Sequence, residues 1–399
     1  MSYKLLSHLY YKNKNEYLKL YEQRVSSEST CMLPIKIGNN NAFYCLCPEI
    51  FDLTVKIMQA DKAVAEIKGD LPEKALIQFA NRCLIDEIKL TNDIEGVYST
   101  RKELSAVLNE MNNKGKKKRF YGLLNKYSML ISGNTFTLNT STDIREIYND
   151  LVLDEVVKEC PDNAPDGEIF RKDMAEVTTS SQKVIHHGVY PEAKIIQLME
   201  QSLNILNKKE IPILIRIAVF HYLFGYIHPF YDGNGRTSRF ISSYLLSKEF
   251  EFLIGFRLSY TIKANIKSYY DAFKECNSDI NMGDLTPFII MFLRIVLESF
   301  ENLLEALEKR NNLLNKYGII LYNDNGLTED LKEFAYILIQ ASLFSDEGIT
   351  KKELGEALDI SASTVDKRLA KLKNILIEDK SGRATKYLID LNKLHESDS

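Results

Sequence analysis

The most restrictive feature of this sequence is the segment 211–227 (IPILIRIAVFHYLFGYI), in which nearly every residue is apolar. A helix that is apolar all round has no face to present to water, so it must lie at the centre of a bundle. Further segments with apolar residues at three- and four-residue spacing are found at 193–207, 235–250, 264–277 and 285–314. The sequence therefore predicts a mainly α-helical bundle with 211–227 at its centre.

Composition limits the class of protein. The chain has 399 residues, of which 45% are apolar and 27% charged, so it can bury the cores of two or three domains. The net charge of −4 gives no general attraction to nucleic acid or to an anionic membrane, so any DNA contact would need a local basic patch. Six scattered cysteines, no secretory leader and no apolar run of roughly 18 residues favour a cytoplasmic protein without a membrane span.

Two hairpins and one long helix are expected around this bundle. In the segment 32–51, Gly38 and three asparagines separate two runs of β-forming residues, which predicts a hairpin. The β-forming residues of 176–191 predict a second, shorter hairpin. A helical pattern opens at Pro72 and stops at Gly96, where a C-terminal glycine is typical. His221 lies within the central apolar segment and is interpreted as a core residue with satisfied hydrogen bonds.

The turn after the central segment predicts an anion site. Pro229 disfavours α geometry at His228, so the central helix must end there. Asp232-Gly233-Asn234-Gly235 then tolerate tight backbone curvature. A glycine-rich turn that feeds a helix N-terminus directs several free N–H groups at one point, where the helix dipole adds partial positive charge. Phosphate suits such a cradle.

Charged side chains around the turn agree with this interpretation. Arg236 and Arg239 fall in the first turn of the next helix, where each cation is unfavourable by about 0.3–1 kcal/mol unless an anion neutralises it. Asp232 would repel phosphate unless a Mg²⁺ ion bridged the two. His228 is able to accept a proton near neutral pH. An ordinary capped loop with two surface arginines is the alternative, but the combination favours nucleotide chemistry.

Residues 228–239, HPFYDGNGRTSR, resemble the signature HPFxDGNGRxxR of the Fic domain family at every defined position. The resemblance extends over roughly 90–300. It implies a Fic-type helical bundle with a small β-hairpin flap formed by 176–191. It also implies transfer of AMP from ATP, with Mg²⁺, to a Tyr, Thr or Ser hydroxyl of a target protein. In HHGVYP the flap departs from the commonest family pattern, so the register of the target segment stays open.

The resemblance also implies roles for individual residues. His228 deprotonates the incoming hydroxyl, Asp232 holds the metal between the α- and β-phosphates, and Phe230 anchors the loop in the core. The Asn234 side chain supports the α-phosphate, and the two arginines take the distal phosphates. The residues expected to bind ATP are Gly233, Asn234, Gly235, Arg236 and Arg239.

The end of the long helix carries a second motif. Glu95 lies in its last turn, where the dipole makes a carboxylate unfavourable, although a solvated glutamate would be ordinary there. TNDIEG resembles the inhibitory motif [S/T]xxxE[G/N] of the same family, with Thr91, Glu95 and Gly96 in register. The resemblance implies that Glu95 pairs with Arg239 and blocks the productive γ-phosphate position. It also allows Glu95 to position a water for removal of AMP.

The C-terminal segment resembles a winged helix-turn-helix. Thr350 and Ser361 are expected to cap two short helices, and Val365 and Leu369 to face inward, with two strands forming a wing. Nearby acids almost cancel the basic side chains, so DNA binding, protein docking and dimerisation all remain open. The expected domains are an N-terminal region with the inhibitory helix (1–100), a Fic catalytic domain (101–315) and the winged-helix domain (325–399).

Two classes of function follow from these patterns. The first is a self-inhibited protein adenylyltransferase whose partners are ATP and a target protein with an accessible hydroxyl. Self-modification and a homodimer also remain open. The second is a nucleotide-sensing, DNA-binding transcriptional regulator, although sensing alone would not require the base His228. Within the enzyme class, UMP, phosphocholine or phosphate transfer and AMP removal are alternatives to AMP transfer.

Overall fold

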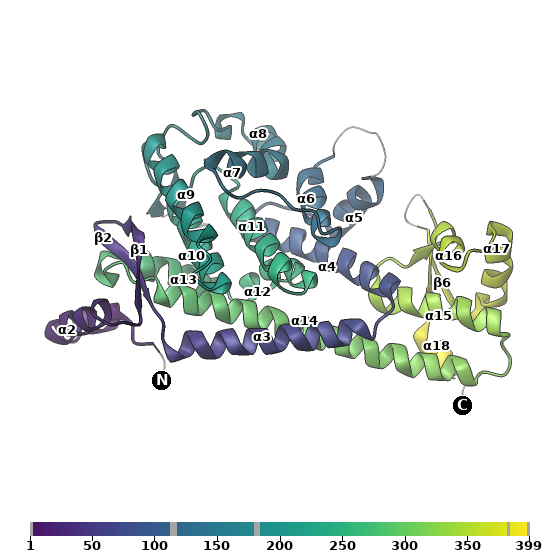
Figure 1. Ribbon diagram of the computed structural model, residues 1–399. Coiled ribbons are helices and arrows are strands. Elements are labelled where there is room, and N and C mark those ends of the chain that lie inside the picture. Colours follow the sequence, from purple (N-terminus) through teal and green to yellow (C-terminus); the bar gives the residue numbers. More distant parts are fainter. Residues whose placement is uncertain (1–2, 112–117, 179–183, 381–383, 397–399) are drawn as a thin grey trace. The chain divides into compact units, whose positions relative to one another are not determined.

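The computed structural model describes residues 3–111, 118–178, 184–380 and 384–396. The fold is mainly helical with three small antiparallel sheets (Figure 1), which confirms the predicted class. The chain forms two compact units, one of Met1–Asp61 with Leu84–Glu301 and one of Lys62–Cys83 with Asn302–Ser399. The expected three-domain division stays a prediction. None of the helices in the described ranges is long and apolar enough to cross a bilayer.

The first unit starts with a small helix pair and a hairpin. These elements are α1 (Leu6–Tyr10), α2 (Lys14–Val25), β1 (Thr30–Ile37) and β2 (Asn40–Cys45). The hairpin was expected at this position, and Gly38 in its turn has a positive φ of 57°. Three long helices contribute residues to both units: α3 (Pro48–Gly69), α4 (Glu73–Ile94) and α14 (Thr286–Asn323). Gly96 follows α4 with φ +75°, as expected for a C-terminal glycine.

Shorter helices make up most of the first unit. They are α5 (Arg101–Glu110), α6 (Tyr121–Ile131), α7 (Ser141–Tyr148), α8 (Asp154–Glu159), α9 (Glu192–Asn207), α10 (Ile213–Ile227), α11 (Asn234–Glu249), α12 (Leu258–Ala264) and α13 (Ile266–Asn277). A π-helical segment, η1 (Asn149–Leu153), joins α7 to α8. The short 3₁₀ turns are η2 (Pro161–Asn163), η3 (Phe252–Phe256) and η4 (Asp279–Asn281).

Helix α10 is the buried centre that the sequence predicted, and it packs against α9 and α11. His221 in its middle is fully buried, with Nδ1 2.8 Å from the Ser242 hydroxyl and Nε2 2.7 Å from the Tyr269 hydroxyl. Burial lowers the pKa of His221 to about 3, so the imidazole is neutral. This confirms its interpretation as a satisfied core residue.

The second expected hairpin consists of β3 (Glu176–Thr178) and β4 (Val184–His187), which pair antiparallel. Its turn, 179–183, lies outside the described residues. Directly after β4, the Val189 N–H donates to the Ile227 carbonyl at 3.0 Å. The hairpin is therefore attached to the end of α10, next to the glycine turn.

The second unit includes a small helical and β-sheet module. Its elements are α15 (Glu329–Phe344), β5 (Ile349–Thr350), α16 (Lys351–Leu358), α17 (Ala362–Lys371), η5 (Lys373–Ile375), β6 (Leu376–Asp379), β7 (Lys386–Ile389) and α18 (Leu391–Glu396). The sheet order is β5-β7-β6, so the module has one strand more than expected, because a two-residue strand such as β5 has no alternation to detect. Thr350 and Ser361 cap α16 and α17 as predicted, and Val365 and Leu369 are buried.

Candidate active site

The turn between α10 and α11 has the backbone geometry that the sequence predicted. Helix α10 ends at Ile227, and His228 follows in a left-handed conformation with φ +52°. Gly233, with φ +79°, is the N-cap of α11. A glycine adopts this conformation without strain, so the turn can direct the first free N–H groups of a 16-residue helix toward one point.

Two side chains lock this turn. The Asn234 side chain accepts a hydrogen bond from the Phe230 N–H at 3.0 Å and donates one to the Phe230 carbonyl at 2.7 Å. The Phe230 ring is fully buried and stacks on Tyr148 with ring centroids 3.6 Å apart. Phe230 thus anchors the loop as expected. The Asn234 amide is already engaged in the loop, which leaves one of its two N–H hydrogens for a ligand.

Arg171 is a component of the site that the sequence analysis missed. Its buried guanidinium donates from Nε to the His228 carbonyl at 2.9 Å and from Nη2 to the Val189 carbonyl at 2.8 Å. A Cβ on Gly188 would lie 2.4 Å from Arg171 Nη2, so the hairpin end approaches this closely only because residue 188 is glycine. Arg171 follows a cluster of turn residues, and nothing in that context distinguishes it from a surface arginine.

His228 is held as a neutral base. Burial lowers its pKa to about 4, with further lowering by His186 and by the Arg171 cation, while Glu95 and a hydrogen bond with the Gly225 backbone act in the opposite direction. A neutral imidazole has a free lone pair at pH 7, as a proton acceptor requires. His186 turns inward, with Nε2 2.7 Å from the Tyr226 carbonyl, whereas its neighbour in the strand, His187, is exposed.

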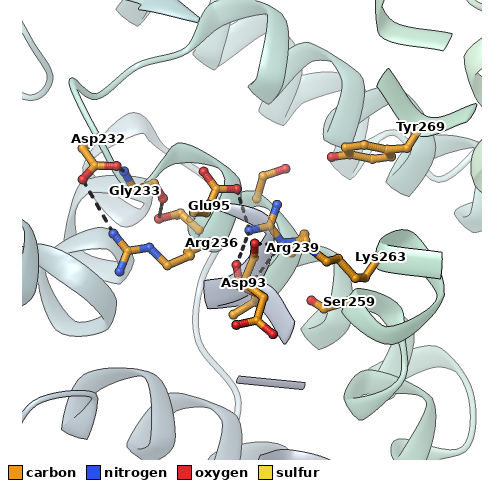
Figure 2. A network of polar contacts seen from close by, with 12 residues as sticks. Asp93, Glu95, Asp232, Gly233, Arg236, Arg239, Ser259, Lys263 and Tyr269 are labelled. Carbon is orange, nitrogen blue, oxygen red and sulfur yellow. Dashed lines mark hydrogen bonds and ion pairs between the residues drawn. The ribbon is translucent and has the colours of Figure 1, made fainter. Parts of the chain in front are cut away.

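Helix α4 holds Arg239 through Nε and Nη2 (Figure 2). Its Nε donates to the Thr91 hydroxyl at 2.7 Å, and its Nη2 donates to the Glu95 carboxylate at 2.7 Å and the Thr91 carbonyl at 3.1 Å. Both the arginine and Thr91 are buried, and the Glu95 side chain is 25% exposed. The contact that the inhibitory motif implied is therefore present; its inhibitory role stays a prediction.

The Glu95 carboxylate also touches the glycine turn itself. A Cβ added to Gly235 would collide with Oε1 and the carboxyl carbon of Glu95. The carboxylate therefore lies directly against the N-terminal turn of α11, where free N–H groups and the helix dipole attract an anion. One end of the predicted anion cradle already holds an anionic group of the protein.

Arg236 points to different carboxylates from Arg239, as Figure 2 shows. Its Nη1 donates to Glu155 of α8 at 3.2 Å, and its Nη2 lies 3.8 Å from an oxygen of Asp232. Burial raises the pKa of Glu155 to about 7, although the Arg236 cation lowers it. Glu155 carries no signal in the sequence, because a lone glutamate in a short helix is usually solvated.

Asp232 meets the requirements for a magnesium ligand that works together with phosphates. Its Oδ1 accepts the Gly233 N–H, whereas Oδ2 has the 3.8 Å ion pair with Arg236. The Asp232 side chain is 36% exposed. Protein Mg²⁺ sites commonly use one or two carboxylates, with substrate phosphates and water as the other ligands. Within the described ranges no group of three or more metal-binding side chains occurs, which this type of site does not need.

Comparison with known proteins agrees with the motif. Residues 138–246 match the Fic/DOC family. Over 97 residues the chain is 33% identical to proteins named "Protein adenylyltransferase Fic" from Drosophila melanogaster and Drosophila simulans. The match covers 24% of this chain but only 18% of either relative.

A solved structure extends the likeness in fold. The crystal structure of a Fic family protein from Desulfovibrio desulfuricans superposes with a TM-score of 0.53 at 19% sequence identity, over 87% of this chain and 97% of that one. At this identity the likeness concerns the fold alone. The signature turn, the helices that hold it and the family match together identify residues 138–246 as a Fic/DOC family domain.

Proposed function

We propose that this chain is a protein adenylyltransferase that transfers AMP from ATP to a Tyr, Thr or Ser hydroxyl of a protein and is restrained by its own Glu95. The observation that carries the proposal is that the loop between α10 and α11 has a proton acceptor at its start and a carboxylate of the protein against its glycine turn. A neutral imidazole, His228, stands at its start, and the Glu95 carboxylate lies against its glycine turn beside Arg239. The naming of distant relatives as adenylyltransferases supports this reaction over transfer of another group.

The reaction would use these groups as follows. His228 accepts the proton of the target hydroxyl while its oxygen attacks the α-phosphorus of ATP. The bond from that phosphorus to the bridging oxygen breaks, and pyrophosphate leaves. The N–H groups at Gly233–Gly235 stabilise charge on the α-phosphate, as in other positioned phosphoryl-type transfers. Mg²⁺ held by Asp232 would supply charge neutralisation between the phosphates.

Glu95 opposes this reaction in two ways. Its carboxylate takes a donor of Arg239 that the terminal phosphate would use, and its negative charge repels that phosphate. A hydrogen bond between charged groups contributes about 1.5–3 kcal/mol, which corresponds to roughly ten- to a hundredfold in rate. We therefore expect Glu95→Gly to transfer AMP about ten- to a hundredfold faster than the wild type.

The experiment compares wild type and Glu95→Gly with labelled ATP and Mg²⁺, with intact mass and peptide mapping to find the modified hydroxyl. Asp93→Asn is a matched control, because Asp93 lies in the same last turn of α4 but pairs with Lys89 at 2.6 Å. Glu95→Gly with His228→Ala should transfer nothing. Equal rates for wild type and Glu95→Gly would contradict restraint by Glu95. Transfer that survives His228→Ala would contradict the proposed base.

We also propose that the module from α15 to α18 is a winged helix that docks a protein. Its basic residues are largely neutralised within the module, since Arg368 pairs with Asp330 at 3.2 Å, Lys351 with Asp366, and Lys386 with Glu347. Such pairing weakens phosphate binding, which depends on net positive charge. A mobility-shift assay with duplex DNA at 150 mM salt should show no complex; a salt-dependent complex would favour the regulator instead.

A further inference from the structure

A buried tyrosine beside the glycine turn has a hydroxyl group without a partner. Tyr148 ends α7, and its ring is fully buried against Phe230. Within the described part of the chain its hydroxyl has no hydrogen-bond partner. Buried polar groups are nearly always paired, so an unpaired hydroxyl in a packed region points to a ligand.

The same region contains two more unpaired donors. Arg236 is fully buried, yet Nε and Nη2 have no hydrogen-bond partner among the described residues, and Nη2 has only the 3.8 Å ion pair with Asp232. After burial itself, the nearby charges of Asp232 and Arg236 have the largest effect on the pKa of Tyr148. The Tyr148 ring also lies 3.2 Å from the Cβ position of Gly233. Three unpaired donors thus surround the Asp232 side of the turn.

Glu155 fixes the orientation of these donors. It takes Nη1 of Arg236 at 3.2 Å and accepts a further hydrogen bond from the Phe120 backbone. Because Nη1 is bonded to Glu155, the nitrogens left to bind a ligand are Nε and Nη2. Between Tyr148 and Glu155 the chain forms the π-helical segment η1. Such wide turns within helices frequently occur at functional sites.

We propose that Tyr148 is a phosphate-contacting residue outside the signature motif, and that Glu155 is a positioning residue for Arg236. In this arrangement the Tyr148 hydroxyl and the free N–H groups of Arg236 donate to oxygens of a phosphate beyond the α-phosphate. The ligand class is a nucleoside di- or triphosphate. The inference rests on the proposed function, because it assigns these donors to the polyphosphate of the same nucleotide.

The test measures nucleotide affinity by calorimetry in the Glu95→Gly background with Mg²⁺. Tyr148→Phe removes the hydroxyl but keeps the ring stacked on Phe230. We expect about tenfold weaker binding of ATP and ADP, as for loss of one hydrogen bond to a charged group, and unchanged binding of AMP. The melting temperature without nucleotide should equal or exceed that of the parent, because the lost hydroxyl had no partner.

Two further variants separate a functional role from a structural one. Tyr222→Phe removes a buried hydroxyl that donates to Asn277 at 2.8 Å, so it should lower the melting temperature and leave ATP affinity unchanged. Glu155→Gln keeps an oxygen to accept from Arg236 and should weaken ATP less than Glu155→Ala does. In both Glu155 variants AMP binding should be retained.

The outcomes distinguish this inference from the proposed function. Tyr148→Phe that binds ATP and ADP as tightly as its parent overturns the role of Tyr148. Glu155 variants that weaken AMP as much as ATP overturn the positioning role, because general damage to the site would then explain the loss. Failure of Glu95→Gly itself to bind ATP would instead contradict the proposed function.

Discussion

Arg236 and Arg239 lie one turn apart on the same helix and are equally buried, yet their surroundings differ. Arg239 donates to Thr91 and Glu95 through Nε and Nη2. Arg236 has one hydrogen-bonded partner, Glu155, and among the described residues its Nε and Nη2 have no hydrogen-bond partner. Both arginines therefore face carboxylates, but buried donors are normally satisfied, and only Arg236 keeps two nitrogens without a hydrogen bond to any residue that the structure describes, the donors that the proposed phosphate would use.

The partners of the two arginines also come from different parts of the chain. Glu155 lies within 138–246, the segment that matches the Fic/DOC family, whereas Thr91 and Glu95 lie on α4, which precedes it. The Glu155–Arg236 contact therefore lies within the segment that matches the family. The contacts of Thr91 and Glu95 with Arg239 come from a helix that precedes this segment. A contact of the second kind can be removed without dismantling the site, which is what a restraint requires.

Removal of Arg236 should have the largest effect on stability. Arg236→Gln leaves the buried Glu155 carboxylate without its cation, and loss of one partner of a buried pair costs about 3–5 kcal/mol. The loss should be greater at pH 8 than at pH 6, because burial raises the pKa of Glu155 and the neutral acid needs no cation. Urea denaturation at both pH values measures this effect.

The matched control for that experiment is Arg236→Gln with Glu155→Gln, which removes both charges and should recover most of the lost stability. Glu95→Gly should cost far less than Arg236→Gln, because Thr91 still accepts from Arg239. If Glu95→Gly destabilised the protein as much as Arg236→Gln, the proposed difference between an added contact and an intrinsic one would be wrong.

An intermediate effect is expected for Thr91→Val, which keeps the side-chain shape but removes the hydroxyl that accepts from Arg239 Nε. An unsatisfied buried donor costs about 1–3 kcal/mol. Because Thr91 and Glu95 hold the same guanidinium, the variant should also raise AMP transfer, and Thr91→Ser should behave like wild type. Thermal unfolding and the labelled-ATP assay measure the two effects. Lower stability without faster transfer would limit Thr91 to a structural role.

How much of this could be predicted from sequence depended on the kind of signal. Helix ends with strong local chemistry were predicted well: Pro229 after α10, and Gly96 after α4. The buried helix α10 was evident because it lacks a polar face. The expected pair of Glu95 and Arg239 rested on a motif resemblance, and no property of α4 alone distinguishes Glu95 from a solvated glutamate.

The missed residues share a physical reason. Tyr148, Glu155 and Arg171 act through partners that are distant in sequence, so neither spacing nor local composition marks them. No pattern in the sequence predicts the π-helical segment between Tyr148 and Glu155. The free donors of Arg236 could be recognised only once the packing around them was known.

The smallest expected effect is a change in the pKa of His228 when Glu95, the partner of Arg239, is removed. Glu95 raises the pKa of His228, whereas burial, His186 and Arg171 lower it to about 4. Loss of the carboxylate in Glu95→Gly should therefore lower that pKa further. ATP brings negative phosphates to the same turn and should raise it again. A neutral His228 thus contributes stability that is present above its ordinary pKa of about 6.5 and is lost as the pH falls toward 4.

Ring signals of His228 followed by NMR between pH 3.5 and 8 test both shifts, with the buried His221 as a reference that stays neutral over most of this range. A pKa of His228 that is the same in wild type and Glu95→Gly would mean that Glu95 acts on Arg239 alone, and that the base is insulated from the restraint.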